Sequence, residues 1–416
     1  MENSTCNDDN ELSEFLESGI YRFQNPNAVF IDPVRVLNRS YTRFRVSPSA
    51  YYSRFFQSKS KHHGELEVSS DSKKRKRKQK KPHNLNERER VAEQRHQKVK
   101  PVLLKAHEAL LGATDLLIAM EKFTSSFRSS TTEPAAGGGG GQSFVELGRV
   151  WQAPMYEITL NYQQSSAIDH CSEQSVLPLF NSLVANETND DVEADVLNRK
   201  YILPRGGCFY MSDLGQIHSL IPVESDYGFN LIVIDPPWEN GSAHQKSMYP
   251  TLPNRYFLSL PIRQLTHTDG ALVALWITNR EKLHNFVEKE LFPAWGVKYA
   301  ATFYWLKVKA DGSLISELDL FHHRPYECLL LGYCSREVSN LENRSTPRPV
   351  KDDQIVISIP GDYSRKPPVG ALLLEHAPGP KPARCIELFA REMTAGWISW
   401  GNEPLHFQES KYFLGD

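Results

Sequence analysis

The stretch that decides the fold is LIVIDPPWENG at residues 231–241. A short run of Leu, Ile and Val without polar alternation is typical of a strand that is buried on both faces inside a sheet. Neither proline after Asp235 can donate to a sheet ladder, so the strand must end where Asp235 begins. The sequence therefore predicts that Asp235 and the three residues after it lie at the carboxyl end of a strand, where open α/β sheets bind their ligands.

The chain around this stretch alternates strand-like and helix-like segments. Three segments short enough to cross over a sheet are expected as helices, at 253–265, 281–292 and 368–375. The expected strands are CFYMSD, NLIVIDPP, ALVALWIT, YAATFYWLKV, YECLLLGY, QIVISIP, IELFA and GWISWGN. This rhythm predicts a doubly wound α/β domain over residues 201–416.

A different organisation is expected before residue 201. Residues 1–143 are interpreted as a mixed, partly disordered N-terminal domain, which ends in a flexible linker with five glycines at 137–141. Residues 144–200 are interpreted as a connecting region, and their sequence indicates no function.

Three features of the N-terminal domain carry expectations. Residues 57–82 are expected to be disordered, and the apolar spacing over 86–123 predicts a helix that is interrupted at Pro101. Aromatic residues and arginines interleave between residues 15 and 56. This mixture fits either the stacking of unpaired bases or a strand whose aromatic side chains pack inward.

The composition is that of a globular protein with one strongly basic segment. Of 416 residues, 40% are hydrophobic and 24% are charged, and the formal net charge is only -2. KKRKRKQKK at 73–81 is nevertheless a dense cationic run. It could be a solvated linker or a contact for nucleic-acid phosphates, but we interpret it as a nuclear import signal. The expected location is therefore the nucleus, with the cytoplasm as a second location.

Membrane insertion, secretion and metal binding are not expected. The longest apolar stretch, GALVALWIT at 270–278, is far shorter than the roughly 20 residues that a membrane span needs. The acidic N-terminus lacks the cationic and apolar segments of a secretory signal. The six cysteines form no CxxC pair. We therefore expect an intracellular protein with reduced cysteines and no metal.

The tetrapeptide at 235–238 combines groups that suit a flat heterocycle with an exocyclic amine. The Asp235 carboxylate and the Pro236 carbonyl could accept both hydrogens of the amine, Pro237 fixes the backbone, and Trp238 could stack on the ring. Such a site works by orientation and charge stabilisation. The alternative interpretation makes Trp238 a core residue and Asp235 a helix cap.

Four motifs in this order resemble those of one enzyme class. They are DPPW at 235–238, RPYECLLLG at 324–332, SRKPP at 364–368 and ELFAREMTAGWISWGNE at 387–403. Together they resemble the MT-A class of S-adenosylmethionine-dependent N6-adenine methyltransferases, and the N-terminal extension is similar to that of the eukaryotic methyltransferase-like four subfamily. The resemblance implies a Rossmann-like methyltransferase domain with permuted motif order, and S-adenosylmethionine as cofactor.

The resemblance also implies roles for individual residues. The catalytic residues that it implies are Asp235, Pro236, Pro237 and Trp238. The implied cofactor-binding residues are Ser212, Asp213, Asp235, Lys366, Arg391, Asn402 and Glu403. The implied substrate-binding residues are Trp238, Tyr249, Glu327, Ser364 and Lys366. Cations, carboxylates and amides together suit the charged ends of the cofactor.

The function that the resemblance implies is methylation of adenine N6 in RNA, with 2′-O-methyladenosine in U2 small nuclear RNA as the expected target. Adenine in DNA is the alternative substrate. A catalytically silent RNA-binding partner of another methyltransferase is the alternative role. We expect a monomer, with spliceosomal or import proteins as candidate partners of the N-terminal region.

Overall fold

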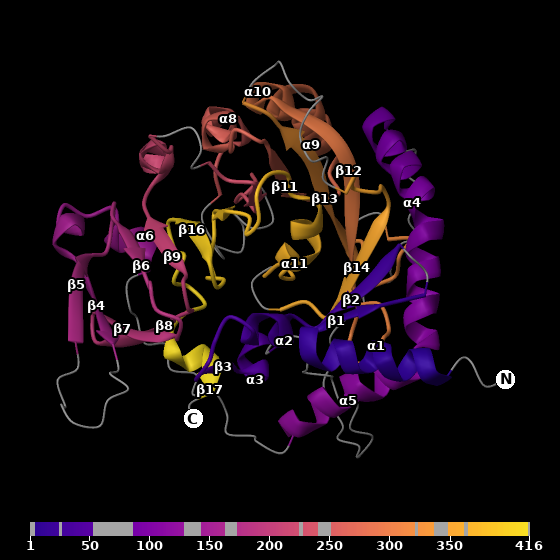
Figure 1. Ribbon diagram of the computed structural model, residues 1–416. Helices are drawn as coiled ribbons and strands as arrows, with labels where there is room; N and C mark the ends of the chain where they lie inside the picture. The colour runs from indigo at the N-terminus through magenta and orange to yellow at the C-terminus, as the bar shows by residue number, and fades with distance from the viewer. Residues whose placement is uncertain are drawn as a thin grey trace, which may run out of the picture.

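The computed structural model describes residues 5–24, 27–52, 86–128, 143–162, 173–223, 228–239, 251–320, 323–336, 348–361 and 365–414. Within these residues, eleven strands form one central sheet (Figure 1). Its strands in spatial order are β1 (Ile20–Arg22), β2 (Ala28–Ile31), β14 (Gln354–Ser358), β12 (Val297–Lys307), β13 (Tyr326–Cys334), β11 (Ala271–Ile277), β10 (Leu231–Ile234), β15 (Cys385–Leu388), β16 (Trp397–Gly401), β9 (Cys208–Met211) and β6 (Leu183–Ala185).

The middle of this sheet is parallel. Strands β9, β16, β15, β10 and β11 follow one another with parallel pairing. All four residues of β10 and all seven of β11 are buried, as the apolar runs predicted. The eight strands expected over residues 201–416 are present, so the prediction of an α/β methyltransferase-like sheet is confirmed.

Helices cover both faces of the sheet, and each face has its own hydrophobic core. One face carries α4 (Glu87–Gly112) together with α8 (Ile262–Leu265), α9 (Glu281–Phe286) and α10 (Phe292–Trp295). The other face carries α11 (Gly370–Leu373). The expected helix at 281–292 continues from α9 through a π-helical turn at 287–291 into α10. The expected helix at 253–265 is instead a 3-10 segment at 254–259 followed by α8.

The expected interruption at Pro101 is wrong. Helix α4 runs through Pro101, and the break lies at Ala113, before α5 (Thr114–Arg128). Pro101 is exposed, so the carbonyl that loses its partner can be hydrated instead. Asn86 begins the helix with a capping box, in which its side chain accepts from the Glu89 amide.

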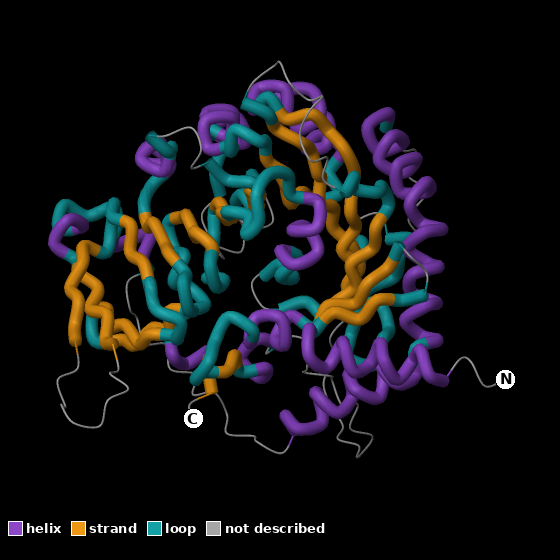
Figure 2. Tube along the Cα trace, viewed as in Figure 1, coloured by secondary structure: helices purple, strands orange, loops and turns teal. Residues whose placement is uncertain are grey.

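The segment before residue 201 contributes to the central sheet at both edges. In the part expected as an N-terminal domain, β2 pairs with β14 and β1 pairs with β2; at the other edge, β6 pairs with β9. A separate antiparallel sheet has the order β5 (Glu173–Pro178), β4 (Glu157–Tyr162), β7 (Val192–Val196) and β8 (Arg199–Leu203). It lies beside the main sheet, at the left of Figure 2. The central sheet therefore contains strands from all three regions that the sequence analysis separated, 1–143, 144–200 and 201–416.

The aromatic and arginine-rich N-terminal segment packs inward where it is described. Tyr41, Tyr51 and Tyr52 are buried, which leaves their rings inaccessible to bases. Besides β1 and β2, the segment forms a third strand, β3 (Arg45–Val46), which pairs with β17 (Phe413–Leu414). The N-terminal part of the chain also forms the helices α1 (Thr5–Ser18), α2 (Pro33–Asn38) and α3 (Pro48–Tyr51). The basic run at 73–81 and the five glycines at 137–141 lie outside the described residues.

None of the helices that the structure describes is both long enough and apolar enough to span a bilayer.

Candidate active site

The predicted motifs meet at one edge of the central sheet. Ile234, Leu388, Trp400 and Tyr210 are register partners on four neighbouring parallel strands. The residues that follow them therefore emerge level with one another at the carboxyl ends of the strands. Asp235 follows β10, Arg391 follows β15, Asn402 follows β16 and Ser212 follows β9. This edge is where such sheets place a ligand.

A chain of alternating charges leads into this edge. Lys307, on β12, forms a short ion pair with Glu327, on β13. Glu327 also pairs with Lys366, whose Nζ lies 3.2 Å from Oε2. The same Nζ lies 3.3 Å from Oδ1 of Asp235. All four side chains are at most one-fifth exposed, so the charges act on one another with little screening by solvent.

The electrostatics of this chain fix the charge state of its middle members. Burial of Glu327 opposes ionisation, but Lys307 and Lys366 outweigh it and lower the pKa of this carboxyl to about 2. Burial likewise disfavours the charged form of Lys366, yet Asp235 and Glu327 raise its pKa above the ordinary value. Glu327 is therefore an anion and Lys366 a cation at neutral pH.

Asp235 and Lys366 open onto a cavity of about 320 Å³. Trp276 and Arg391 also line it, and so does Glu387, the β15 residue that is in register with Val233. Burial raises the pKa of Glu387 to about 8, with further contributions from Glu392 and Asp235. Glu387 therefore keeps its proton to a higher pH than an exposed carboxyl group does.

One wall of the cavity comes from the N-terminal segment. Val36, Leu37, Arg39 and Ser40 line it, and the Ser40 hydroxyl accepts a hydrogen bond from the Ala395 amide at 3.2 Å. The cavity is therefore built from segments more than 350 residues apart in sequence.

A buried arginine supports the same wall. Arg365 forms a short ion pair with Glu392, and its guanidinium lies 4.2 Å from the ring centres of both Tyr51 and Phe407. Glu392, together with Tyr51 and Tyr41, raises the pKa of Arg365 against the opposing effect of burial. Arg365 precedes Lys366, so this stacking fixes the backbone from which Lys366 reaches Asp235.

Trp238 is a core residue and not part of the cavity wall. It is 7% exposed, meets the Phe257 ring edge-to-face at 5.1 Å and donates its indole N–H to the Trp276 carbonyl at 2.8 Å. Stacking of Trp238 on a base stays a prediction; in the described structure its ring packs on Phe257 and does not line the cavity. The Pro236 and Pro237 carbonyls accept from the Trp238 and Leu252 amides respectively, so the Pro236 oxygen is partly engaged.

Several other predicted residues lie at the edge but outside the cavity wall. The Ser212 hydroxyl accepts from the Trp400 indole at 2.9 Å, and the Asp213 carboxylate accepts from the Gln216 amide at 3.2 Å, which caps a 3-10 helix. Asn402 is exposed, and Glu403 lies 3.4 Å from a ring nitrogen of His406. None of the four is among the residues lining the cavity.

Two of the predicted substrate residues, Tyr249 and Ser364, fall outside the described residues. Conversely, the prediction did not include Lys307, Trp276, Glu387 and the N-terminal wall. The local signal for Glu387 is a charged residue inside an otherwise apolar strand; Lys307 is the last residue of its strand and carries no such signal.

Comparison with known proteins agrees with this geometry. Residues 229–403 match the MT-A70 family. The chain is 36% identical over 242 residues to the N(6)-adenine-specific methyltransferase METTL4 of Mus musculus, covering 57% of this chain and 50% of that protein. It is 33% identical over 224 residues to the N6-methyladenosine RNA methyltransferase MTA1 of Pyricularia oryzae (52% and 57%). It is 30% identical over 217 residues to the DNA N6-methyl methyltransferase of Caenorhabditis elegans (51% and 56%).

The chain thus spans about half the length of the curated relatives that it matches. The matched region begins two residues before β10 and ends at Glu403, so it contains Asp235, Glu327, Lys366 and Arg391. Residues 229–403, which hold these four residues, are thus similar to the MT-A70 family.

Proposed function

We propose that this protein transfers a methyl group from S-adenosylmethionine to N6 of adenine in a nucleic acid. The observation that carries the proposal is the ion-paired chain from Lys307 to Asp235, which ends in a cavity at the carboxyl edge of the sheet. Three of the relatives are named as N6 methyltransferases, and these names support the same activity.

The residues around the cavity fit the cofactor that the family implies. S-adenosylmethionine carries a carboxylate, an ammonium group and a sulfonium, and when bound it supplies an electrophilic methyl group. Lys366 and Arg391 offer cations, whereas Asp235 and Glu387 offer carboxyl groups, all on the same wall. Burial raises the pKa of Glu387, with smaller contributions from Glu392 and Asp235, and Arg391 opposes the rise; a positively charged ligand beside this carboxyl group would favour its ionised form.

Asp235 is positioned to orient the adenine amine. Lys366 holds Oδ1 at 3.3 Å, and a carboxylate has a second oxygen, Oδ2, that can accept an amine hydrogen. An aromatic amine becomes acidic only after it has been alkylated, so Asp235 need not remove a proton before transfer. Its contribution is to direct the amine and to stabilise the positive charge that develops on nitrogen.

RNA is the substrate that we favour, with 2′-O-methyladenosine in U2 small nuclear RNA as the specific target. This choice rests on the resemblance to the methyltransferase-like four subfamily and on an RNA methyltransferase among the relatives. A DNA methyltransferase among the relatives makes adenine in DNA the second candidate. A silent partner role is disfavoured because Asp235, Lys366 and Glu327 form one connected network.

We also propose that the protein acts in the nucleus and as a monomer, and that its N-terminal region contacts import or spliceosomal proteins. The basic run at 73–81 supports nuclear import. Neutralising its lysines in a fluorescent fusion should shift the protein to the cytoplasm, and an unchanged nuclear signal would refute this role.

The activity is tested with the purified full chain and labelled S-adenosylmethionine. The acceptors are short RNAs with adenosine or 2′-O-methyladenosine, and matched DNA. Asp235→Asn keeps the shape of the side chain and should abolish transfer, whereas Asp115→Asn on the exposed surface of α5 should not. Label chiefly in 2′-O-methyl RNA supports the specific substrate. Label in DNA alone would replace it, and no label with the cofactor still bound would favour the silent-partner role.

A further inference from the structure

Two arginines line the mouth of the cavity without a role in the network described above. Arg39 follows α2, and Arg205 lies between β8 and β9. Both line the cavity, and both are exposed. Arg205 donates from its guanidinium to the Arg39 carbonyl at 3.0 Å, which keeps the two residues adjacent.

Neither arginine forms an ion pair with a described carboxylate, unlike several of their neighbours. Arg365 is paired with Glu392, Arg43 is paired with Asp191, and Arg35 is paired with Asp32. Arg39 and Arg205 thus add two exposed positive charges at the rim of a cavity whose interior contains carboxyl groups.

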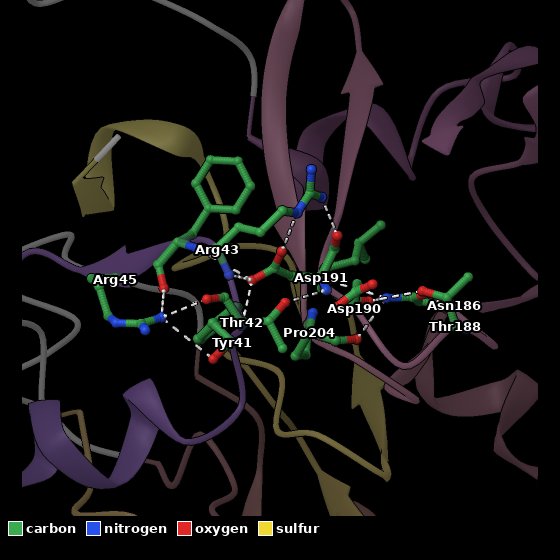
Figure 3. Close-up of polar contacts among 11 residues, drawn as sticks. Tyr41, Thr42, Arg43, Arg45, Asn186, Thr188, Asp190, Asp191 and Pro204 are labelled. Atoms are coloured by element: carbon green, nitrogen blue, oxygen red, sulfur yellow. Dashed lines mark hydrogen bonds and ion pairs between the residues drawn. The ribbon is translucent and has the colours of Figure 1, made fainter. Parts of the chain in front are cut away.

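One loop fixes the backbone next to both arginines, after Arg39 and before Arg205 in the chain. Figure 3 shows the polar contacts of this loop, residues 186–191, which we call the anchor loop. The buried Asp191 carboxylate accepts from the Thr42, Arg43 and Phe44 amides at 2.8, 2.9 and 3.2 Å, shortly after Arg39 in the chain.

The other end of the anchor loop holds the strand that leads to Arg205. The Asn186 side-chain amide donates to the Pro204 carbonyl at 3.0 Å and to the Asp190 carbonyl at 2.8 Å. The Asn186 backbone amide donates to the Gly207 carbonyl at 2.9 Å. Because the same loop anchors both flanking segments, the backbone near each arginine is fixed before any ligand binds, which lowers the entropic cost of ordering that backbone on binding.

We propose that Arg39 and Arg205 form a clamp for a nucleic-acid phosphate at the mouth of the cavity. The clamp would bind the sugar-phosphate backbone next to the nucleotide whose base enters the cavity. This inference rests on the proposed function. A base that reaches Asp235 must leave its sugar and phosphate near the rim, where the exposed positive charges lie. Guanidinium groups bind phosphate with charge-assisted hydrogen bonds.

The same chemistry could bind the carboxylate of the cofactor, and the experiment separates the two anions. The variants are Arg39→Gln, Arg205→Gln and the double variant, in the full chain. Arg149→Gln is the matched control, because Arg149 is exposed and does not line the cavity. Affinity for a fluorescein-labelled single-stranded RNA is measured at several salt concentrations, and affinity for S-adenosylhomocysteine is measured by calorimetry.

We expect each single variant to bind RNA about fivefold more weakly, and the dependence of log K on log salt to become less steep by about 0.7 for each lost phosphate contact. Affinity for S-adenosylhomocysteine should not change. Arg149→Gln should behave as the wild type.

The clamp is refuted if both variants bind RNA with wild-type affinity and salt dependence. A loss of S-adenosylhomocysteine affinity with unchanged RNA affinity also refutes it, and assigns the arginines to the cofactor. Failure of the proposed function gives a different result, because wild-type protein would then transfer no methyl group to any acceptor. The RNA-binding arm would still decide whether the arginines contact phosphate.

Discussion

Removal of Lys307 tests whether the ion-paired chain is needed for the charge state of the site. Lys307→Met keeps the apolar stem and deletes the cation that contacts Glu327. Glu327 then retains only Lys366 as a cationic partner. We expect the pKa of Glu327 to rise, the protein to lose stability at neutral pH, and Lys366 to hold Asp235 less firmly.

The magnitude follows from the pKa of Glu327. Its fall from the ordinary value of 4.5 to about 2 corresponds to about 3 kcal/mol of stabilisation of the ionised form, at 1.36 kcal/mol per pKa unit. Lys307 and Lys366 together provide this stabilisation. One of the two lysines accounts for roughly half of this, so Lys307→Met should cost about 2 kcal/mol of unfolding free energy at pH 7, below the ~3–5 kcal/mol typical of a broken buried ion pair.

The pH dependence gives the sign of the effect. A carboxyl group with a depressed folded-state pKa stabilises the protein above its unfolded-state value and loses that contribution as pH falls. The stability difference between wild type and Lys307→Met should therefore be constant from pH 7 to about 5 and narrow as pH falls from about 4.5 toward 2.

The assay is urea unfolding at pH 7, 5 and 3.5, combined with single-turnover methyl transfer. Lys307→Arg preserves the charge and should lose much less than Lys307→Met, and Lys309→Met is a control because Lys309 is exposed on the same segment. A stability loss that is independent of pH, or equal losses in the Met and Arg variants, would show that Lys307 acts by packing and not by charge.

Three further predictions concern groups elsewhere in the fold. Trp238→Phe should lower the free energy of unfolding by about 1–3 kcal/mol, because it leaves the buried Trp276 carbonyl without its indole donor. Urea unfolding and cofactor titration check this prediction. Weakened cofactor binding with normal stability would contradict the core role of Trp238. The pKa of Glu387, about 8, lies above its unfolded value, so the cofactor-free protein should lose stability as pH rises from about 5 to 8. In thermal unfolding, Glu387→Gln should remove this dependence of stability on pH. An unchanged dependence would show that another group causes it. Asp191→Asn should destabilise the protein by about 2–4 kcal/mol, because a buried charged acceptor of three amides is lost, whereas Asp190→Asn at the exposed neighbouring position should have little effect in the same denaturation assay.

The parts of the site that could be predicted depend on local sequence. An apolar run that ends at two prolines fixes the end of β10, and thus the position of Asp235, without reference to any distant residue. β15 ends at Leu388 without a proline, three residues before Arg391. Because parallel strands end at a common edge, the two residues could be predicted to lie near one another.

The remaining parts depend on tertiary contacts that a linear pattern does not record. The partner of the Trp238 indole is a carbonyl on β11, 38 residues away, and that contact turns a residue with an apparent role in base stacking into a core residue. A charged side chain such as Glu387 inside a strand reads as solvent-facing until the packing of the cavity wall shows it to be largely buried. The helix through Pro101 persists for a similar reason, since its apolar face packs on the sheet.

The N-terminal segment illustrates how far the site depends on such contacts. A recruitment module would be dispensable for the chemistry and would touch the catalytic domain only weakly. Here β1 and β2 extend the sheet, Arg39 and Ser40 line the cavity, and Tyr51 stacks on the arginine that precedes Lys366. The segment is therefore a structural part of the site, so a role in recruiting partners can only be additional to its role in shaping the cavity.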